Sequence, residues 1–180
     1  MDYKTMIQEC IALLGDDYTA SAEELELLQK RMGRCINYAY ERIARNYFHP
    51  VTTEEVTTDE KCRVKKQLLK ESFWYLRSAR CNGNVVSASV ESSEIFVGSR
   101  PNSKVELTYC YVPSFMKNDD DVPCIPQGEI SPQVYIFKAL SIFMNTEGRN
   151  DDAVIYAAQA DAALVGCGYP IAVMPQRRWL

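Results

Sequence analysis

The fold class of this chain is most clearly indicated by residues 105–165, which read VELTYCYVPSFMKNDDDVPCIPQGEISPQVYIFKALSIFMNTEGRNDDAVIYAAQADAALV. This stretch begins with alternating apolar and polar residues up to Pro113, a pattern typical of a half-buried β-strand. A loop with consecutive aspartates and two further prolines follows. Apolar residues then recur every three or four positions in two stretches, which the segment EGRN separates. The sequence therefore predicts a strand, a long loop over residues 113–128, a helix, a tight turn and a second helix.

The two C-terminal stretches predict a helical hairpin over residues 129–165. Ser131 and Pro132 suit the start of its first helix, and Gly148 suits its end. We expect Asn150 to cap the second helix. The apolar positions of that helix are small, and small residues allow two helix backbones to approach closely. These positions are Ala153, Ala157, Ala160 and Ala163.

Residues 1–48 predict two more helices. The first covers about residues 2–14, where apolar residues share one face. Ser21 and Glu24 form a capping box at the start of the second helix, whose apolar stripe continues over about six turns. Gly33 lies within this long helix and is expected to cost about 1 kcal/mol of stability relative to alanine.

Residues 51–112 show the period of two that is typical of β-strands. The segments VTTEEVTT, SFWYLRSAR, EIFVG and KVELTYCYV are predicted strands, and KCRVKKQLLKE is predicted to be an irregular basic connector. Asn82-Gly83 indicates a hairpin because both residues accept positive φ, and a return strand is expected over Asn84–Glu91. We expect a small antiparallel sheet of roughly four or five strands. The predicted fold class is α+β: a bundle of two N-terminal helices and a C-terminal helical hairpin, with the β region inserted between them.

The net charge of the chain is −4, and its sequence pI is about 5.1. Proteins that bind nucleic-acid phosphates usually have the opposite charge balance. The N-terminus lacks the basic start and apolar run of a signal peptide, and no run of about 18 apolar residues predicts a membrane span. The 7 cysteines include no C-x-x-C pair. An odd number of cysteines without an export signal favours reduced thiols in a protein made in a cytosol.

The candidate catalytic and metal-binding residues each have a simpler interpretation. His49 is the only histidine and adjoins Pro50, so a solvent-facing or hydrogen-bonded helix-end residue is favoured over a Ser-His or Cys-His pair. Asp119, Asp120 and Asp121 could hold a hard cation, but they lack the spacing of a calcium loop, and a solvated acidic loop is favoured. No phosphate-binding, dinucleotide-binding or zinc-protease motif is present. We therefore predict a protein that is not an enzyme and that has no cofactor and no metal site.

Two basic stretches are candidates for binding a partner. The first could face phosphates or an acidic surface, but a solvated or protein-facing run is favoured because no aromatic residues are interleaved with its charges. It contains Lys61, Arg63, Lys65, Lys66 and Lys70. The second is the tail over residues 166–180, in which Trp and Arg, residues enriched at interface hot spots, lie together. We predict partner binding by its last residues, with a disordered end or one folded back on its own sheet as the alternative. These residues are Arg177, Arg178, Trp179 and Leu180.

The order of these elements resembles that of the head–tail connector (adaptor) proteins of tailed bacteriophages. The pieces that carry the resemblance are TYCYVP at residues 108–113, DDDVPCIP at 119–126 and EGRNDDAVIYAAQADAAL at 147–164. The segments GRCINYAYERIARNYF and RSARCNGNVV are similar to those of the podovirus-type members. The resemblance covers nearly the whole chain as a pattern of elements, with no catalytic residues to carry over, and QRRWL matches no motif of the family.

The resemblance implies a single connector domain in a structural virion protein of the neck between capsid and tail, assembled in the host cytoplasm. Copies of the chain would close into a ring, commonly of about twelve, through heterologous contacts. The ring would bind the portal protein and a tail or nozzle protein, and no membrane. Genomic double-stranded DNA would pass through its lumen without sequence-specific contact. Twelve copies at −4 each give about −48, which would weaken adhesion of DNA.

Two alternatives to the connector remain at this level. A tail-completion or stopper protein would have a different position in the same virion. A metal-dependent hydrolase would use the loop Asp119–Asp121, and replacement of its three aspartates by asparagine would then abolish metal binding in calorimetry.

Deletion of Gln176–Leu180 is expected to impair assembly of the ring while leaving thermal stability nearly unchanged, because the segment is predicted to bind a partner. Light scattering with and without portal protein measures assembly, and thermal unfolding of the isolated chain measures stability. A large fall in melting temperature would instead place the segment in the core of the monomer.

Overall fold

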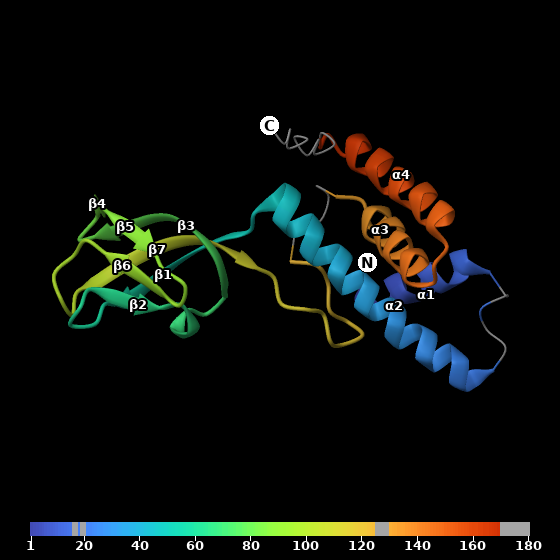
Figure 1. The fold of residues 1–180 in the computed structure, drawn as a ribbon, viewed down its shortest axis with the longest axis horizontal. Coiled ribbons are helices and arrows are strands. Elements are labelled where there is room, and N and C mark those ends of the chain that lie inside the picture. Colours follow the sequence, from blue (N-terminus) through green and yellow to red (C-terminus); the bar gives the residue numbers. More distant parts are fainter. Residues whose placement is uncertain (16–17, 19–20, 125–129, 170–180) are drawn as a thin grey trace, which may run out of the picture. The chain divides into compact units, whose positions relative to one another are not determined.

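The structure is a computed structural model that describes residues 1–15, 18, 21–124 and 130–169 (Figure 1). Helices and antiparallel strands are both present, so the fold is α+β, as the sequence predicts. The contacts divide the chain into two compact units. The helical unit consists of Met1–Tyr47 and the chain from Phe115 onward, and the β unit consists of Phe48–Ser114. The chain therefore leaves the helical unit once, forms the β unit, and returns.

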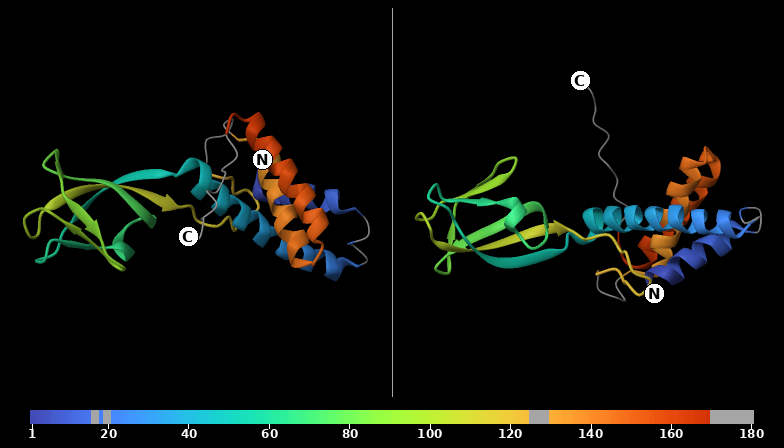
Figure 2. Two further views of the ribbon diagram at one scale, coloured as in Figure 1. Left: turned by 45° about the horizontal axis from the view of Figure 1, so that its top comes forward. Right: turned by 90° about the horizontal axis from the view of Figure 1, so that it is seen from below.

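Four α-helices form the described part of the helical unit (Figure 2). The third helix, α3, packs against both α2 and α4, and α1 packs against α2 and α3. The long α2 continues into one π-helical turn, Ala44–Phe48. The helices are α1 (Tyr3–Leu14), α2 (Ala22–Ile43), α3 (Pro132–Thr146) and α4 (Asn150–Gly166).

The predicted helix starts are confirmed for α2 and α3 and differ by one residue for α4. Ser21 Oγ accepts from the backbone N–H of Glu24 at 3.2 Å, and Ser131 caps α3 in the same way. Asn150, expected to be the cap of α4, is its first helical residue, and Arg149 occupies the cap position. The reason is that the carbonyl of Arg149 already accepts the backbone N–H of Ala153 at 3.0 Å, which closes the first helical turn one residue early.

The core of the helical unit is made largely by the predicted apolar stripes. Burial of each large side chain contributes roughly 1.5–3 kcal/mol, so these stripes are what holds the four helices together. The largest completely enclosed side chains of this core are Tyr40, Phe143, Met6, Met32, Ile36, Ile43 and Leu140, of which Tyr40 and Met6 lie outside the predicted stripes. None of the helices in the described residues has both the length and the apolarity needed to cross a membrane.

The β unit has two sheets, where the sequence predicts one. Four strands pair in the order β1-β7-β3-β4, and three pair in the order β2-β6-β5. All described pairings are antiparallel. The strands are β1 (Val51–Thr57), β2 (Arg63–Lys65), β3 (Ser72–Cys81), β4 (Asn84–Val86), β5 (Ala88–Val90), β6 (Glu94–Val97) and β7 (Lys104–Val112).

The strand that returns from the Asn82-Gly83 turn is divided at Ser87, and this division creates the second sheet. The hairpin itself is confirmed, with φ values of 51° and 78° at its two residues. Before Ser87 the strand pairs with β3, and after it with β6. Gly98 N–H donates to the carbonyl of Ser87 at 2.7 Å, and a Cβ on Gly98 would lie 2.4 Å from Ser87 Oγ. A Cβ at this position would have to displace the Ser87 side chain, so glycine favours the crossing, which depends on a contact beyond the Asn82-Gly83 hairpin.

The segment predicted to be an irregular connector contributes β2 and a short 3-10 turn, Lys66–Leu68. Val64 and Leu69 of this segment enter the core of the β unit, together with the predicted inward face of β7. That face comprises Val105, Leu107 and Tyr109, with Tyr111 packed at its edge.

Gly33 is an interhelical contact as well as a weak helix former. A Cβ at this position would lie 2.4 Å from Tyr3 Oη and 3.2 Å from Tyr3 Cζ on α1. Tyr3 Oη also accepts a hydrogen bond from Asn37 Nδ2 at 3.2 Å, so the tyrosine is not free to move aside at no cost. The glycine therefore allows α1 to lie close to α2.

We expect Gly33→Ala to lower the free energy of unfolding by about 1 kcal/mol. Overpacking costs roughly 1–3 kcal/mol, and the better helix propensity of alanine returns about 1 kcal/mol. In a Tyr3→Phe background the nearest atom is gone, so the same substitution should cost less or stabilise. Urea unfolding of the four proteins of this cycle measures both effects, and an equal cost in both backgrounds would contradict the contact.

Candidate functional site

Asp121 organises the described part of the aspartate loop. Its Oδ2 accepts the backbone N–H groups of Lys117 at 2.6 Å and Asn118 at 2.9 Å, and its Oδ1 accepts from Asn118 Nδ2 at 3.2 Å. These hydrogen bonds, those of the backbone foremost, hold the pKa of the Asp121 carboxyl below its usual value of 3.8. The ionised carboxylate is thus engaged in closing a turn of its own loop.

The loop is fixed to the start of α1 through its backbone carbonyls. The N–H of Tyr3 donates to the carbonyl of Asp121 at 2.8 Å, and the N–H of Lys4 donates to the carbonyl of Asp119 at 3.1 Å. Lys4 Nζ also lies 3.1 Å from a carboxylate oxygen of Asp119, although both side chains are largely exposed and this ion pair is weak. The loop therefore supplies acceptors for N–H groups that a helix start leaves without intrahelical partners.

The buried side chain of Asn37 on α2 fixes the loop at Met116. Asn37 Oδ1 accepts the backbone N–H of Met116 at 2.8 Å, and Asn37 Nδ2 donates to the carbonyl of Met116 at 3.0 Å. Both residues are almost completely enclosed, at 6% and 5% exposure. Further along the loop, Tyr40 Oη accepts the backbone N–H of Cys124 at 2.9 Å. Burial and the neighbouring Cys124 thiol raise the pKa of Tyr40, so the phenol stays protonated.

These contacts show how the aspartates predicted as a possible cation site are used. Asp121 closes a turn, and Asp119 faces Lys4. Among the described residues, no group of three or more His, Cys, Asp or Glu side chains is arranged so that it could hold a metal ion. The arrangement supports attachment of the loop to α1 and α2.

His49 lies in the β unit against aromatic rings. Its imidazole stacks on Trp74 with a centroid distance of 5.3 Å and an interplanar angle of 22°, and it meets Tyr75 edge-on at 6.1 Å. Its Nδ1 is enclosed and has no hydrogen-bond partner within the described ranges. The residue is half-buried and stacked, which differs from the solvent-facing or hydrogen-bonded residue predicted from the sequence.

Two members of the basic stretch between β1 and β3 contact their own chain. Arg63 pairs with Glu94 at 2.8 Å and Glu91 at 3.1 Å. Lys66 Nζ donates to the backbone carbonyl of Glu91 at 2.6 Å and lies 4.9 Å from the centroid of the Phe73 ring. These contacts join the stretch to the β5–β6 connection, in agreement with the protein-facing interpretation.

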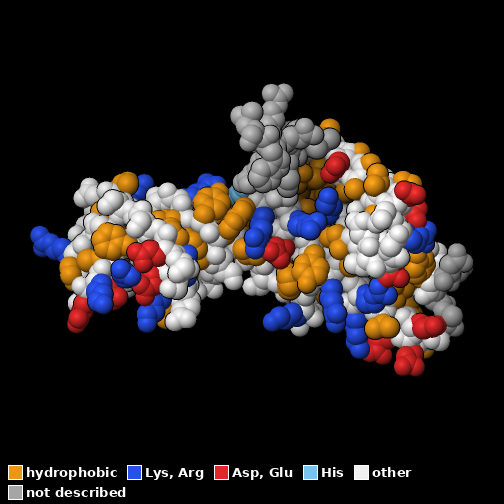
Figure 3. All heavy atoms as spheres, viewed as in Figure 1, with side chains coloured by type: hydrophobic (Ala, Val, Ile, Leu, Met, Phe, Trp, Pro, Cys, Tyr) orange, Lys and Arg blue, Asp and Glu red, His pale blue; other side chains and the backbone are white. Residues whose placement is uncertain are grey.

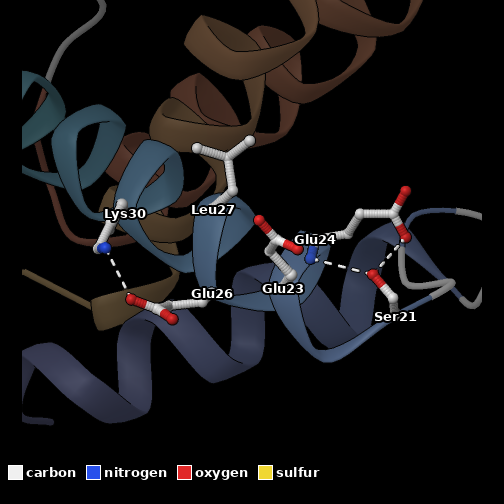
Figure 4. Close-up of a pocket in the computed structure, with 6 residues that line it drawn as sticks. All are labelled: Ser21, Glu23, Glu24, Glu26, Leu27 and Lys30. Atoms are coloured by element: carbon white, nitrogen blue, oxygen red, sulfur yellow. Dashed lines mark hydrogen bonds and ion pairs between the residues drawn. The ribbon is translucent and has the colours of Figure 1, made fainter.

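A pocket of about 470 Å³ at the start of α2 has the acidic lining that a helix start favours (Figure 4). Its polar groups contact one another: Lys30 Nζ lies 2.7 Å from Glu26 Oε1, and Ser21 Oγ donates to Glu24 Oε2 at 2.9 Å. Leu27 is the apolar member of the lining. The polar residues that line the pocket therefore cap and stabilise the start of α2.

The side of α4 that faces away from α3 is apolar, and this outward face is the least expected surface of the helical unit. Val154, Ile155 and Val165 are 68%, 55% and 51% exposed, and Ala158 and Ala162 lie exposed between them. The opposite side of α4 buries Ala153, Ala160 and Leu164. In Figure 3 hydrophobic side chains are visible where α4 lies in Figure 1, with acidic side chains beside them. An α-helix that is apolar on both sides is typical of a buried helix, so this face is suited to a further protein surface.

A second exposed stripe follows α2 and combines aromatic and basic side chains. Leu27, Arg34, Tyr38 and Arg42 recur at helical spacing, and Leu27 and Tyr38 are 58% and 52% exposed. Tyr38 contacts the ring of Phe115 edge-on at 5.8 Å. Beside Tyr38 lies a hollow of about 360 Å³. Neither this stripe nor the outward face of α4 was predicted from the sequence, because their apolar residues lie outside the core-facing stripes that helical periodicity identifies.

We expect Asp121→Ala to lower the urea midpoint at pH 7, because it removes the two carboxylate oxygens that accept three hydrogen bonds in the turn. The pKa of Asp121 is lower in the folded chain than its ordinary 3.8, so its contribution is present above that value and is lost as pH falls through the lowered folded pKa. The difference from the unmodified chain should therefore narrow below about pH 4. Asp120→Ala is the matched control, and equal effects of the two variants at pH 7 would contradict the role of Asp121.

The four predicted partner-binding residues, Arg177, Arg178, Trp179 and Leu180, lie outside the described residues. The described chain offers two exposed surfaces on the helical unit that contain apolar groups, the outward face of α4 and the stripe on α2. Both are suited to protein contacts, and neither gathers the side chains of a catalytic centre. Neither the models of known protein families nor the curated protein sequences include a match to this chain.

Proposed function

We propose that this chain is a structural virion protein of a tailed bacteriophage, a head–tail connector that forms a ring between the portal protein and the tail. In this proposal its partners are copies of itself, the portal protein and a tail or nozzle protein, and its location is the neck of the virion after assembly in the host cytoplasm. Double-stranded DNA passes through the lumen without sequence-specific contact.

The observation that carries the proposal is the construction of the helical unit from both ends of the chain. Two N-terminal helices and a C-terminal hairpin pack together, and the β unit is inserted between them. This is the order of elements on which the resemblance to the connector family rests. The aspartate loop, which joins the inserted unit to the hairpin, is attached to α1 and α2 through Asp121, Asn37 and Tyr40.

The exposed apolar surface of α4 supports assembly as part of this function. A helix that displays Val154, Ile155 and Val165 to solvent costs solubility unless another protein surface covers it. In a closed ring each subunit uses two different surfaces, one toward each neighbour, and the two exposed surfaces of the helical unit meet that requirement.

The charge of the chain supports passage of DNA. The net charge of −4 per copy gives a ring a negative field, which opposes adhesion to phosphates. Two of the clustered basic residues contact their own chain: Arg63 pairs with two glutamates, and Lys66 donates to the carbonyl of Glu91.

The direct test is electron microscopy of the purified chain mixed with purified portal protein. The expected result is a ring of additional density on one end of the portal, absent from portal alone. Binding only to a portal that already carries a connector ring would favour a tail-completion or stopper protein. Absence of binding to portal in either form would overturn the proposal.

A further inference from the structure

We propose that a second copy of this chain docks the part of its α2 stripe that carries Arg34, Tyr38 and Arg42 on the outward face of α4, the face made by Val154, Ile155, Ala158, Ala162 and Val165. The inference rests on the proposed ring and deepens it, because it names the two surfaces that meet. The partner that covers the α4 face is thus a second copy of the same chain.

The shape of the α4 face suits another helix. Its residues recur at positions 154, 158, 162 and 165, which lie on one side of an α-helix. The large residues are at the two ends, and Ala158 and Ala162 between them leave room for a side chain from the partner. Small residues in the centre allow the partner backbone to approach. Tyr38 is exposed at the middle of the α2 stripe, where such a knob is required.

The charges of the two surfaces are complementary. Arg34 and Arg42 flank Tyr38 on α2 and are exposed. Asp151 and Asp161 lie at the start and along the edge of the α4 face. None of these four side chains forms an ion pair with another residue in the part of the chain that the structure describes. By contrast, the neighbouring Lys30 and Arg31 on α2, Arg45 in the π-helical turn that follows it, and Asp152 on α4 all have ion-pair partners.

The spacing of these charges also corresponds. Eight residues separate Arg34 from Arg42, which is about 12 Å along a helix, and ten separate Asp151 from Asp161, about 15 Å. Arginine side chains are long enough to bridge the difference. Two arginines around an aromatic residue can thus face two aspartates around an apolar centre.

Area explains why this contact needs a ring or a template. The α4 face covers about 11 residues, or roughly 17 Å of helix, and a helix is about 10 Å wide. The resulting area of about 170 Å² is well below the roughly 800 Å² that each partner contributes to a standard interface. A single contact of this kind is therefore weak, and repetition around a closed ring, or alignment on a portal, is what makes it persistent.

The proposed contact between α4 and α2 differs from the contact in a symmetric dimer in the number of copies that assemble. A contact between α4 and α2 is heterologous, so a pair of copies retains a free α2 stripe on one copy and a free α4 face on the other, and growth continues until the ring closes. A contact between two α4 faces would be isologous and would stop at two copies. It would also bring Asp151 and Asp161 of one copy near those of the other, so like charges would meet.

The first experiment places a photo-crosslinking amino acid at position 158 of the full chain. Unlabelled and 15N-labelled chains are mixed, with and without portal protein, over a concentration series, and crosslinked peptides are identified by mass spectrometry. The expected products join position 158 of one copy to residues 27–42 of another. Products that join position 158 to residues 150–166 of another copy, or an absence of products between copies in all mixtures, would overturn the inference.

The second experiment reverses charges. Asp151→Arg with Asp161→Arg, and separately Arg34→Asp with Arg42→Asp, should each reduce the yield of the crosslink at least tenfold. The chain that carries all four substitutions should recover it. Loss in both double variants without recovery in the combined chain would overturn the pairing of these charges.

Two controls separate assembly from folding and from the proposed function. Val85→Lys introduces a lysine at a 71% exposed apolar residue of the β unit and should leave the crosslink unchanged, whereas Ile155→Lys should abolish it. Both variants should have the same melting temperature as the unmodified chain. Rings on portal with crosslinks elsewhere would end this inference and leave the connector function standing. If the predicted crosslinks form but the protein does not bind portal, the contact between α2 and α4 stands and the connector function is overturned.

Discussion

The pairing of Asn37 with the backbone of Met116 is the contact on which the arrangement of this chain depends. The β unit is an insertion, so the chain must return to the helices it left; the helical unit resumes at Phe115, and the next residue, Met116, is bonded to Asn37. Both the N–H and the carbonyl of Met116 are bonded to one buried amide. A buried polar group without a partner costs roughly 1–3 kcal/mol, so any other position of the returning chain would leave several such groups unsatisfied. The carbonyls of Asp119 and Asp121 then complete the start of α1, which joins the N-terminal helix to the same loop.

The helical unit has a well-packed core, but the outward face of α4 leaves apolar side chains exposed to solvent. The central α3 contacts α2 and α4, and the enclosed side chains of Ile36, Leu140 and Phe143 account for its stability. The fourth helix supplies small residues to that core and has an apolar surface left over on its other side. For an isolated monomer this surface is unfavourable, because apolar area exposed to water costs roughly 25 cal/mol per Å². In the proposed ring the same surface is the means of assembly.

Local patterns in the sequence were sufficient for the elements and for several of their ends. The caps at Ser21 and Ser131, the turn at Asn82-Gly83 and the inward face of β7 were all predicted, because each depends on a few neighbouring residues. For Gly33 the structure adds a contact with Tyr3 of another helix to the predicted weakness as a helix former. The prediction of a single sheet failed because a residue outside the local pattern decides it: the second sheet requires Gly98 to approach Ser87. The stacking of His49 on Trp74 was missed for the same reason. The predicted residues at the C-terminus stay predictions.

The fold class, the order of the elements and the division into a helical part and an inserted β part all follow from patterns in the sequence. Hydrophobic periodicity and capping are local properties, and they are written in the order of the residues. Which side chains are engaged within the chain and which stay exposed depends on how the elements pack. The tertiary structure engages the carboxylate of Asp121 in a turn, and it turns Val154 and Ile155 of α4 toward solvent. The sequence of a helix shows which of its residues are apolar. Which of those residues remain exposed depends on the elements that pack against the helix.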